Sequence, residues 1–109
     1  KFPELRKLGL SVYYLENHYN SIAKLTKLEE LNLSSQKLEK LPESLGKLSQ
    51  LQNLDLSFNR LETLPDFIGN LSNLTLLDIS GNFIPQDEIE KIQKMLPDCN
   101  IIDVFGYKR

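Results

Sequence analysis

The chain has 109 residues, of which 40% are hydrophobic and 26% are charged, and this is the ordinary range for one globular domain. The formal net charge is -2 and the Lys and Arg residues are dispersed among acids, which argues against nucleic acid as a partner. No apolar run approaches the roughly 18 residues of a membrane span, so we expect no membrane insertion. The single cysteine leaves the cellular compartment open.

A period of 23 residues runs along the chain. The frame L-x-x-L-x-L occurs four times, with Ile as its last residue in the fourth copy, and it opens at Leu5, Leu28, Leu51 and Leu74. The alternation at the end of the frame is that of a strand, so its leucines should point inward and the residues between them outward. We therefore predict one short strand per repeat, stacked beside the next strand in parallel.

The segments between the predicted strands turn back at a proline in the two middle repeats, at Pro42 and Pro65. Proline removes a backbone donor and stops a strand from continuing. The segments 43–48 and 66–71 that follow have apolar residues three apart, which is typical of a turn of 3₁₀- or α-helix. We expect these short helices to form a second layer on the outer side of the sheet.

The pattern changes after Pro85. Residues 87–96 carry an apolar stripe and have acids in the first turn, which indicates a helix whose buried face contains Ile89, Ile92, Met95 and Leu96. Pro97 ends this predicted helix, and residues 100–105 are predicted to form a last strand.

The segments 51–61 and 74–84 read L-x-x-L-x-[LI]-x-x-N-x-[LI], and this pattern resembles the leucine-rich repeat family in its 23-residue subtype. The resemblance implies an α/β right-handed solenoid, with short parallel strands on a concave face, 3₁₀- or short helices on a convex face and a C-terminal capping helix. It also implies that Asn59 and Asn82 satisfy backbone groups of adjacent turns. Tyr13 and Gln36 replace the asparagine in the first two repeats, so we expect irregular loops there.

We predict one leucine-rich repeat domain over residues 1–109, with repeats at about 5–27, 28–50, 51–73 and 74–84 and a C-terminal cap at 85–105. Lys1 and Phe2 fall in the slots of Lys24 and Leu25, so we interpret the chain as a fragment that begins within a repeat. An uncapped first strand would make self-association through the N-terminal edge a candidate interaction. The run at 94–102 is similar to the end of many bacterial leucine-rich repeat proteins and implies a bacterial source.

Asp55 and Asp78 fall in equivalent outward slots, at a spacing that would suit a glycosidase carboxylate pair or part of a calcium site. An open sheet offers no water-excluding cleft to raise one pKa, so we predict a solvated acidic patch instead. The only histidine, His18, is expected in the interior, and Cys99 is expected to be a buried, inert thiol. The sequence therefore predicts no catalytic residue, no metal site and no cofactor.

The outward slots of neighbouring strands should form rows across the concave face, and these rows are our candidate partner-binding surface. Binding surfaces also favour aromatic and arginine anchors, such as Arg60, Phe83 and three tyrosines at 13, 14 and 19. Packing against neighbouring turns is the preferred interpretation of the two phenylalanines in the later repeats, with an anchor role as the alternative. The candidate partner-binding residues are Lys7, Glu30, Asn32, Asn53, Asp55, Ser57, Phe58, Leu76 and Asp78.

We predict a non-catalytic protein–protein interaction module that binds another protein on its concave face. Two alternatives stay open. The repeats could select the substrate of, or regulate, a larger bacterial enzyme such as an effector ligase or a GTPase, because fold alone does not fix function. The Asn, Asp and Ser rows could also bind carbohydrate.

Overall fold

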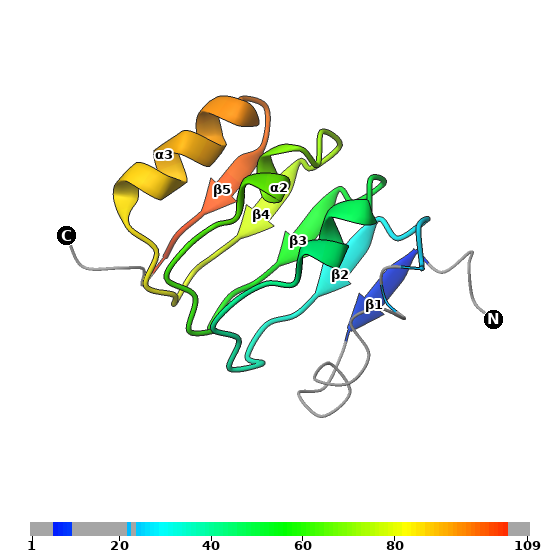
Figure 1. The fold of residues 1–109 in the computed structure, drawn as a ribbon, viewed down its shortest axis with the longest axis horizontal. Helices are drawn as coiled ribbons and strands as arrows, with labels where there is room; N and C mark the ends of the chain where they lie inside the picture. Colours follow the sequence, from blue (N-terminus) through cyan, green and yellow to red (C-terminus); the bar gives the residue numbers. More distant parts are fainter. Residues whose placement is uncertain (1–5, 10–21, 23, 105–109) are drawn as a thin grey trace.

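The computed structural model describes residues 6–9, 22 and 24–104, and within them the chain forms one parallel sheet in the order β1-β2-β3-β4-β5 (Figure 1). Each strand has three residues: β1 (Lys7–Gly9), β2 (Glu30–Asn32), β3 (Asn53–Asp55), β4 (Leu76–Asp78) and β5 (Asn100–Ile102). The first four strands pair in the register of the 23-residue period, with Leu31 opposite Leu54 and Leu54 opposite Leu77. The predicted stack of short parallel strands is confirmed.

Three helices whose bounds the structure describes lie on one side of the sheet: the 3₁₀-helix η1 (Glu43–Lys47) and the α-helices α2 (Asp66–Gly69) and α3 (Gln86–Met95) (Figure 1). Each one begins directly after an extended proline, which is Pro42, Pro65 or Pro85. Proline lacks the backbone N–H that a helix start leaves without an intrahelical partner, so it is well suited to the position directly before each helix. The predicted outer layer of short helices is confirmed.

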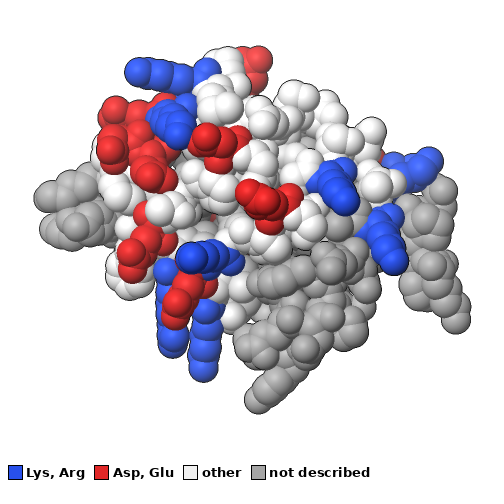
Figure 2. All heavy atoms as spheres, in the orientation of Figure 1, with Lys and Arg blue, Asp and Glu red and all other residues white. Residues whose placement is uncertain are grey.

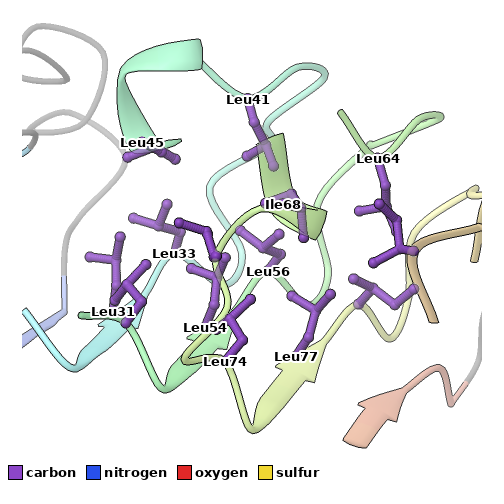
Figure 3. Close-up of a cluster of buried hydrophobic side chains, with 14 of the residues drawn as sticks. Leu31, Leu33, Leu41, Leu45, Leu54, Leu56, Leu64, Ile68, Leu74 and Leu77 are labelled. Atoms are coloured by element: carbon purple, nitrogen blue, oxygen red, sulfur yellow. The ribbon is translucent and has the colours of Figure 1, made fainter. Parts of the chain in front are cut away.

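The core lies between these two layers and consists of the inward positions of the repeat frame (Figure 3). Leu31, Leu54 and Leu77 stand in one column, and none is more than 2% exposed. Burying a leucine side chain stabilises a fold by about 1.5–3 kcal/mol, so each repeat adds several kcal/mol of apolar burial through its neighbours. The alternation of inward and outward residues is therefore observed as predicted.

An asparagine ladder holds the loops that follow β3 and β4. Asn59 is 4% exposed, and its Nδ2 donates to the carbonyl oxygens of Leu33, Leu56 and Ser57 at 2.9, 2.9 and 3.3 Å. Its Oδ1 accepts from the backbone N–H groups of Gln36 and Leu38 at 2.8 and 3.0 Å, one repeat earlier. The structural role that the resemblance implies for this asparagine is confirmed.

Asn82 repeats this arrangement, and its Oδ1 accepts from the N–H of Leu61 at 3.0 Å. In the second repeat Gln36 occupies the slot and its Nε2 reaches the carbonyl oxygen of Ser34 at 3.1 Å. The loop there differs as expected, because Lys37 has a φ of 58°, whereas the equivalent Arg60 and Phe83 have no positive φ.

The end of the described chain departs from the sequence expectations in three details. The helix covers Gln86–Met95, one residue earlier than predicted, and the last strand ends at Ile102. Met95 was expected in the buried stripe and is 40% exposed, because it lies at the edge of the α2–α3 contact. Its Sδ is only 2.5 Å from the place where a Cβ on Gly69 would stand, so the missing side chain of that glycine lets α3 approach α2.

The expectations for the first repeat concern residues outside the described ranges. These are the interior position of His18, the tyrosine anchors at 13, 14 and 19, and the irregular loop at Tyr13. Among the helices of the described ranges, none combines the length and the apolar character needed to cross a membrane.

Candidate functional site

A shallow hollow of about 470 Å³ lies over the outward face of β1–β4, on the side of the sheet away from the helices, and we call it the sheet groove. All the candidate partner-binding residues line it except Ser57 and Phe58. The outward positions of neighbouring strands therefore meet in one place, as the register of the repeats requires. Its walls consist of Lys7, Leu8, Glu30, Leu31, Asn32, Asn53, Leu54, Asp55, Leu76 and Asp78.

The first row of the groove runs through Lys7, Glu30, Asn53 and Leu76, which pair in register from β1 to β4. Lys7 Nζ lies 3.6 Å from Glu30 Oε2, so these two opposite charges form an ion pair at the β1 end of the row. Asn53 and Leu76 are half-buried, and within the described residues the side chain of Asn53 makes no hydrogen bond. The row therefore changes from charged to apolar along the sheet and leaves uncommitted groups at its centre.

The second row, Asn32, Asp55 and Asp78, has a structural role that sequence reasoning missed. Each Oδ1 accepts the backbone N–H of the serine two residues later, at 2.9, 2.9 and 3.0 Å respectively. In the first two positions the serine hydroxyl also donates, at 2.7 and 2.6 Å. The signal was present in the sequence as [ND]-x-S, a pattern that caps the turn at the end of a strand.

Ser57 does not belong to the exposed surface, and the expectation that its slot points outward is wrong. It is 6% exposed, and Ser80 in the next repeat is 5% exposed with its Oγ accepting the N–H of Val104 at 2.9 Å. The strand ends at Asp55, so the two-residue alternation does not extend to the serine, whose hydroxyl instead donates to Asp55 Oδ1.

Phe58 lies outside the groove lining and is 54% exposed. Its φ of 56° places a bulky residue in the left-handed region, and its ring covers Gly81, where an added Cβ would stand 2.5 Å from Phe58 Cδ1. The preferred expectation of packing against a neighbouring turn is therefore met in part, with more than half of the side chain still open to solvent. Phe83 is equally exposed.

A second hollow of about 700 Å³ lies among the loops and was not anticipated from the sequence. Arg60 and Phe83, which line it, hold equivalent slots 23 residues apart, so their adjacency follows from the repeat. Glu39, Lys40 and Glu62 add charges of both signs. This mixture gives the loop hollow no preference for one sign of charge.

Charged side chains of both signs are present on the surface of the described residues (Figure 2). On the face drawn in Figure 2, basic and acidic side chains are both present, and the basic ones form no continuous stripe. No described group of three or more His, Cys, Asp or Glu residues is placed to hold a metal ion. Cys99 is 4% exposed, as predicted, and its burial raises the pKa of the thiol, which disfavours the reactive thiolate.

The family profile described as a leucine-rich repeat region matches residues 1–99. The chain belongs to the leucine-rich repeat family. A leucine-rich repeat protein of the bacterium Leptospira interrogans is 45% identical over 75% of the chain, with a TM-score of 0.70. Human trophoblast glycoprotein, also called Wnt-activated inhibitory factor 1, is 27% identical over 75% of the chain, with a TM-score of 0.62.

Internalin C2 of Listeria monocytogenes shares the fold, at 22% identity over 80% of the chain and a TM-score of 0.53. The leucine-rich repeat chain spans 21%, 31% and 46% of the length of these three structures. No curated protein matches it. Leucine-rich repeat domains in general act as protein-interaction modules, and the bacterial relative agrees with the source expected from the sequence.

Proposed function

We propose that this leucine-rich repeat domain binds another protein in the sheet groove. The supporting observation is that the groove brings together side chains that the fold itself does not use, above all Asn53 and Leu76 at its centre. A polar amide beside an apolar side chain is the combination that fixes orientation and excludes water in protein interfaces.

The rigidity of the groove supports this proposal. Each groove strand pairs in register with its neighbours, and the loops beyond β3 and β4 are fixed by the buried amides of Asn59 and Asn82. A surface that is already ordered loses less conformational entropy when a partner binds. The stack of repeats therefore serves to hold the groove residues in a preorganised arrangement.

We propose that the domain itself is non-catalytic. A carboxylate pair works as acid and base only when its environment separates the two pKa values, which usually requires burial. Asp55 and Asp78 line an open hollow, and one oxygen of each is already engaged by the N–H of a serine. The same bonds weigh against the carbohydrate alternative, since they occupy acceptors that a sugar hydroxyl would need.

A photo-crosslinking experiment tests the binding face. The photoreactive residue p-benzoylphenylalanine replaces Asn53 in the groove of the intact protein, and in a matched variant it replaces Asn70, the exposed residue that ends α2 on the opposite layer. We expect a crosslinked protein from the native cells at position 53 and none at position 70. Crosslinking at position 70 alone, or equally at both positions, would contradict the proposal.

A further inference from the structure

Two acidic residues of the sheet groove stand directly opposite one another. Asp55 and Asp78 are register partners on β3 and β4, and neighbouring strands lie about 4.8 Å apart. Like charges in facing positions of a sheet destabilise it. The pair therefore places two negative charges side by side on the outward face of the sheet.

The fold does not require this charge. In the second repeat the same slot holds Asn32, whose Oδ1 accepts the N–H and the hydroxyl of Ser34 at 2.9 and 2.7 Å. Asp55 makes the same two bonds to its own serine at 2.9 and 2.6 Å. An amide thus performs the structural task equally well, and the negative charge at Asp55 and Asp78 is left without a structural explanation.

The groove also lacks a counter-charge for the pair. Within the described residues no Lys, Arg or His nitrogen lies within 4.0 Å of either carboxylate. The one lysine of the groove, Lys7, is on β1 beside Glu30, two strands away from Asp55. The surface around β3 and β4 is therefore negative, and it is complementary to a partner that carries positive charge.

Phe58 provides an independent observation at the same end of the strands. The equivalent slots hold Ser35 and Gly81, so a small residue satisfies the left-handed turn, yet a bulky ring is placed there and is 54% exposed. Bulky residues with positive φ are strained, and such strain is characteristic of binding positions. The N–H of Phe58 donates to the carbonyl oxygen of Ser80 at 2.7 Å, which fixes its backbone beside the serine held by Asp78.

We propose that the sheet groove docks a segment of a protein partner in which a lysine or arginine lies next to an apolar side chain. The cation meets Asp55 and Asp78 in the groove, and the apolar side chain reaches beyond the groove, past the end of β3, to Phe58. This inference rests on the proposed protein-binding function of the groove and specifies the chemistry of the partner.

Selection of random peptides displayed on phage against the immobilised intact protein tests this inference. We expect enriched sequences that contain Lys or Arg beside an apolar residue, with affinity that falls as salt concentration rises. The double variant Asp55→Asn and Asp78→Asn keeps the serine bonds and should bind these peptides roughly tenfold more weakly. Asp98→Asn, which removes an exposed charge outside the groove, should leave their affinity unchanged.

Phe58→Ser introduces at position 58 the serine that the second repeat has at the equivalent position, Ser35. It should weaken the selected peptides several-fold without lowering the melting temperature, a combination that a purely structural phenylalanine would not give. Enrichment of acidic or neutral peptides whose binding is lost in Leu76→Arg would overturn the basic-partner inference and leave the groove function standing. Peptides unaffected by any groove variant, or no enrichment at all, would overturn both.

Discussion

Replacing Asn59 by alanine should destabilise the domain far more than the loss of one side chain usually does. The side chain makes five hydrogen bonds, three through Nδ2 and two through Oδ1. After the change the carbonyl oxygen of Ser57 still accepts the N–H of Ser35, and that of Leu56 still accepts Asn82 Nδ2. The groups that lose a partner are therefore the N–H of Gln36, the N–H of Leu38 and the carbonyl oxygen of Leu33.

A backbone group left without a partner inside the protein costs about 1–3 kcal/mol. The carbonyl oxygen of Leu33 and the N–H of Leu38 are two such groups, so Asn59→Ala should lower the free energy of unfolding by at least ~2 kcal/mol. This is a large fraction of the roughly 5–15 kcal/mol that stabilises a typical domain. Urea unfolding followed by far-UV circular dichroism measures the loss, provided that the slope against urea is equal in both proteins.

The matched control is Asn53→Ala, which removes the same amide from the half-buried centre of the sheet groove. It should change the free energy of unfolding by less than about 0.5 kcal/mol. A loss below about 1 kcal/mol for Asn59→Ala, or similar losses for the two variants, would refute the reasoning that the asparagine ladder supports the loops.

Three further predictions concern single residues. Leu54→Ala empties a core position and should cost about 2–5 kcal/mol in urea unfolding, whereas Leu76→Ala on the outward face should cost under about 1 kcal/mol; equal losses would contradict the alternation. Asp55→Ala leaves two serine donors without their acceptor and should cost about 1–2 kcal/mol, while Asp55→Asn should be nearly neutral in the same assay. The Cys99 thiol should react with a disulfide reagent much more slowly in the folded than in the unfolded protein, because burial raises its pKa. For the same reason its contribution to the free energy of unfolding should fall as pH rises past the thiol's ordinary pKa. Fast labelling of the folded protein would contradict this.

The sequence was sufficient for the architecture because the repeat frame carries two periods at once. The 23-residue period sets the register of the strands, and the two-residue alternation sets which leucines enter the core, as the column through Leu31, Leu54 and Leu77 shows. Proline marked where the helices after the second and third strands begin. Each of these signals is local and recurs in successive repeats, so each repeat supports the same interpretation independently.

The errors arose where the alternation was extended beyond the strand. Ser57 was assigned to the exposed surface by counting in twos from Asn53 and Asp55, but the strand ends at Asp55 and the serine is buried. The exposure of Phe58 could not be predicted from the pattern, since a left-handed turn is ordinarily filled by a smaller residue. Both features depend on turn geometry, which the hydrophobic pattern does not encode.

Mapping the partner onto the folded domain by NMR tests the central claim most directly. The partner is first identified by crosslinking at position 53. Amide chemical shifts of the ¹⁵N-labelled intact protein are then recorded with and without that partner added. The account predicts that the largest changes fall on Glu30, Asn53 and Leu76 in the sheet groove, with small changes in α2 and α3. Changes confined to the helical layer, with the groove amides unmoved, would contradict it.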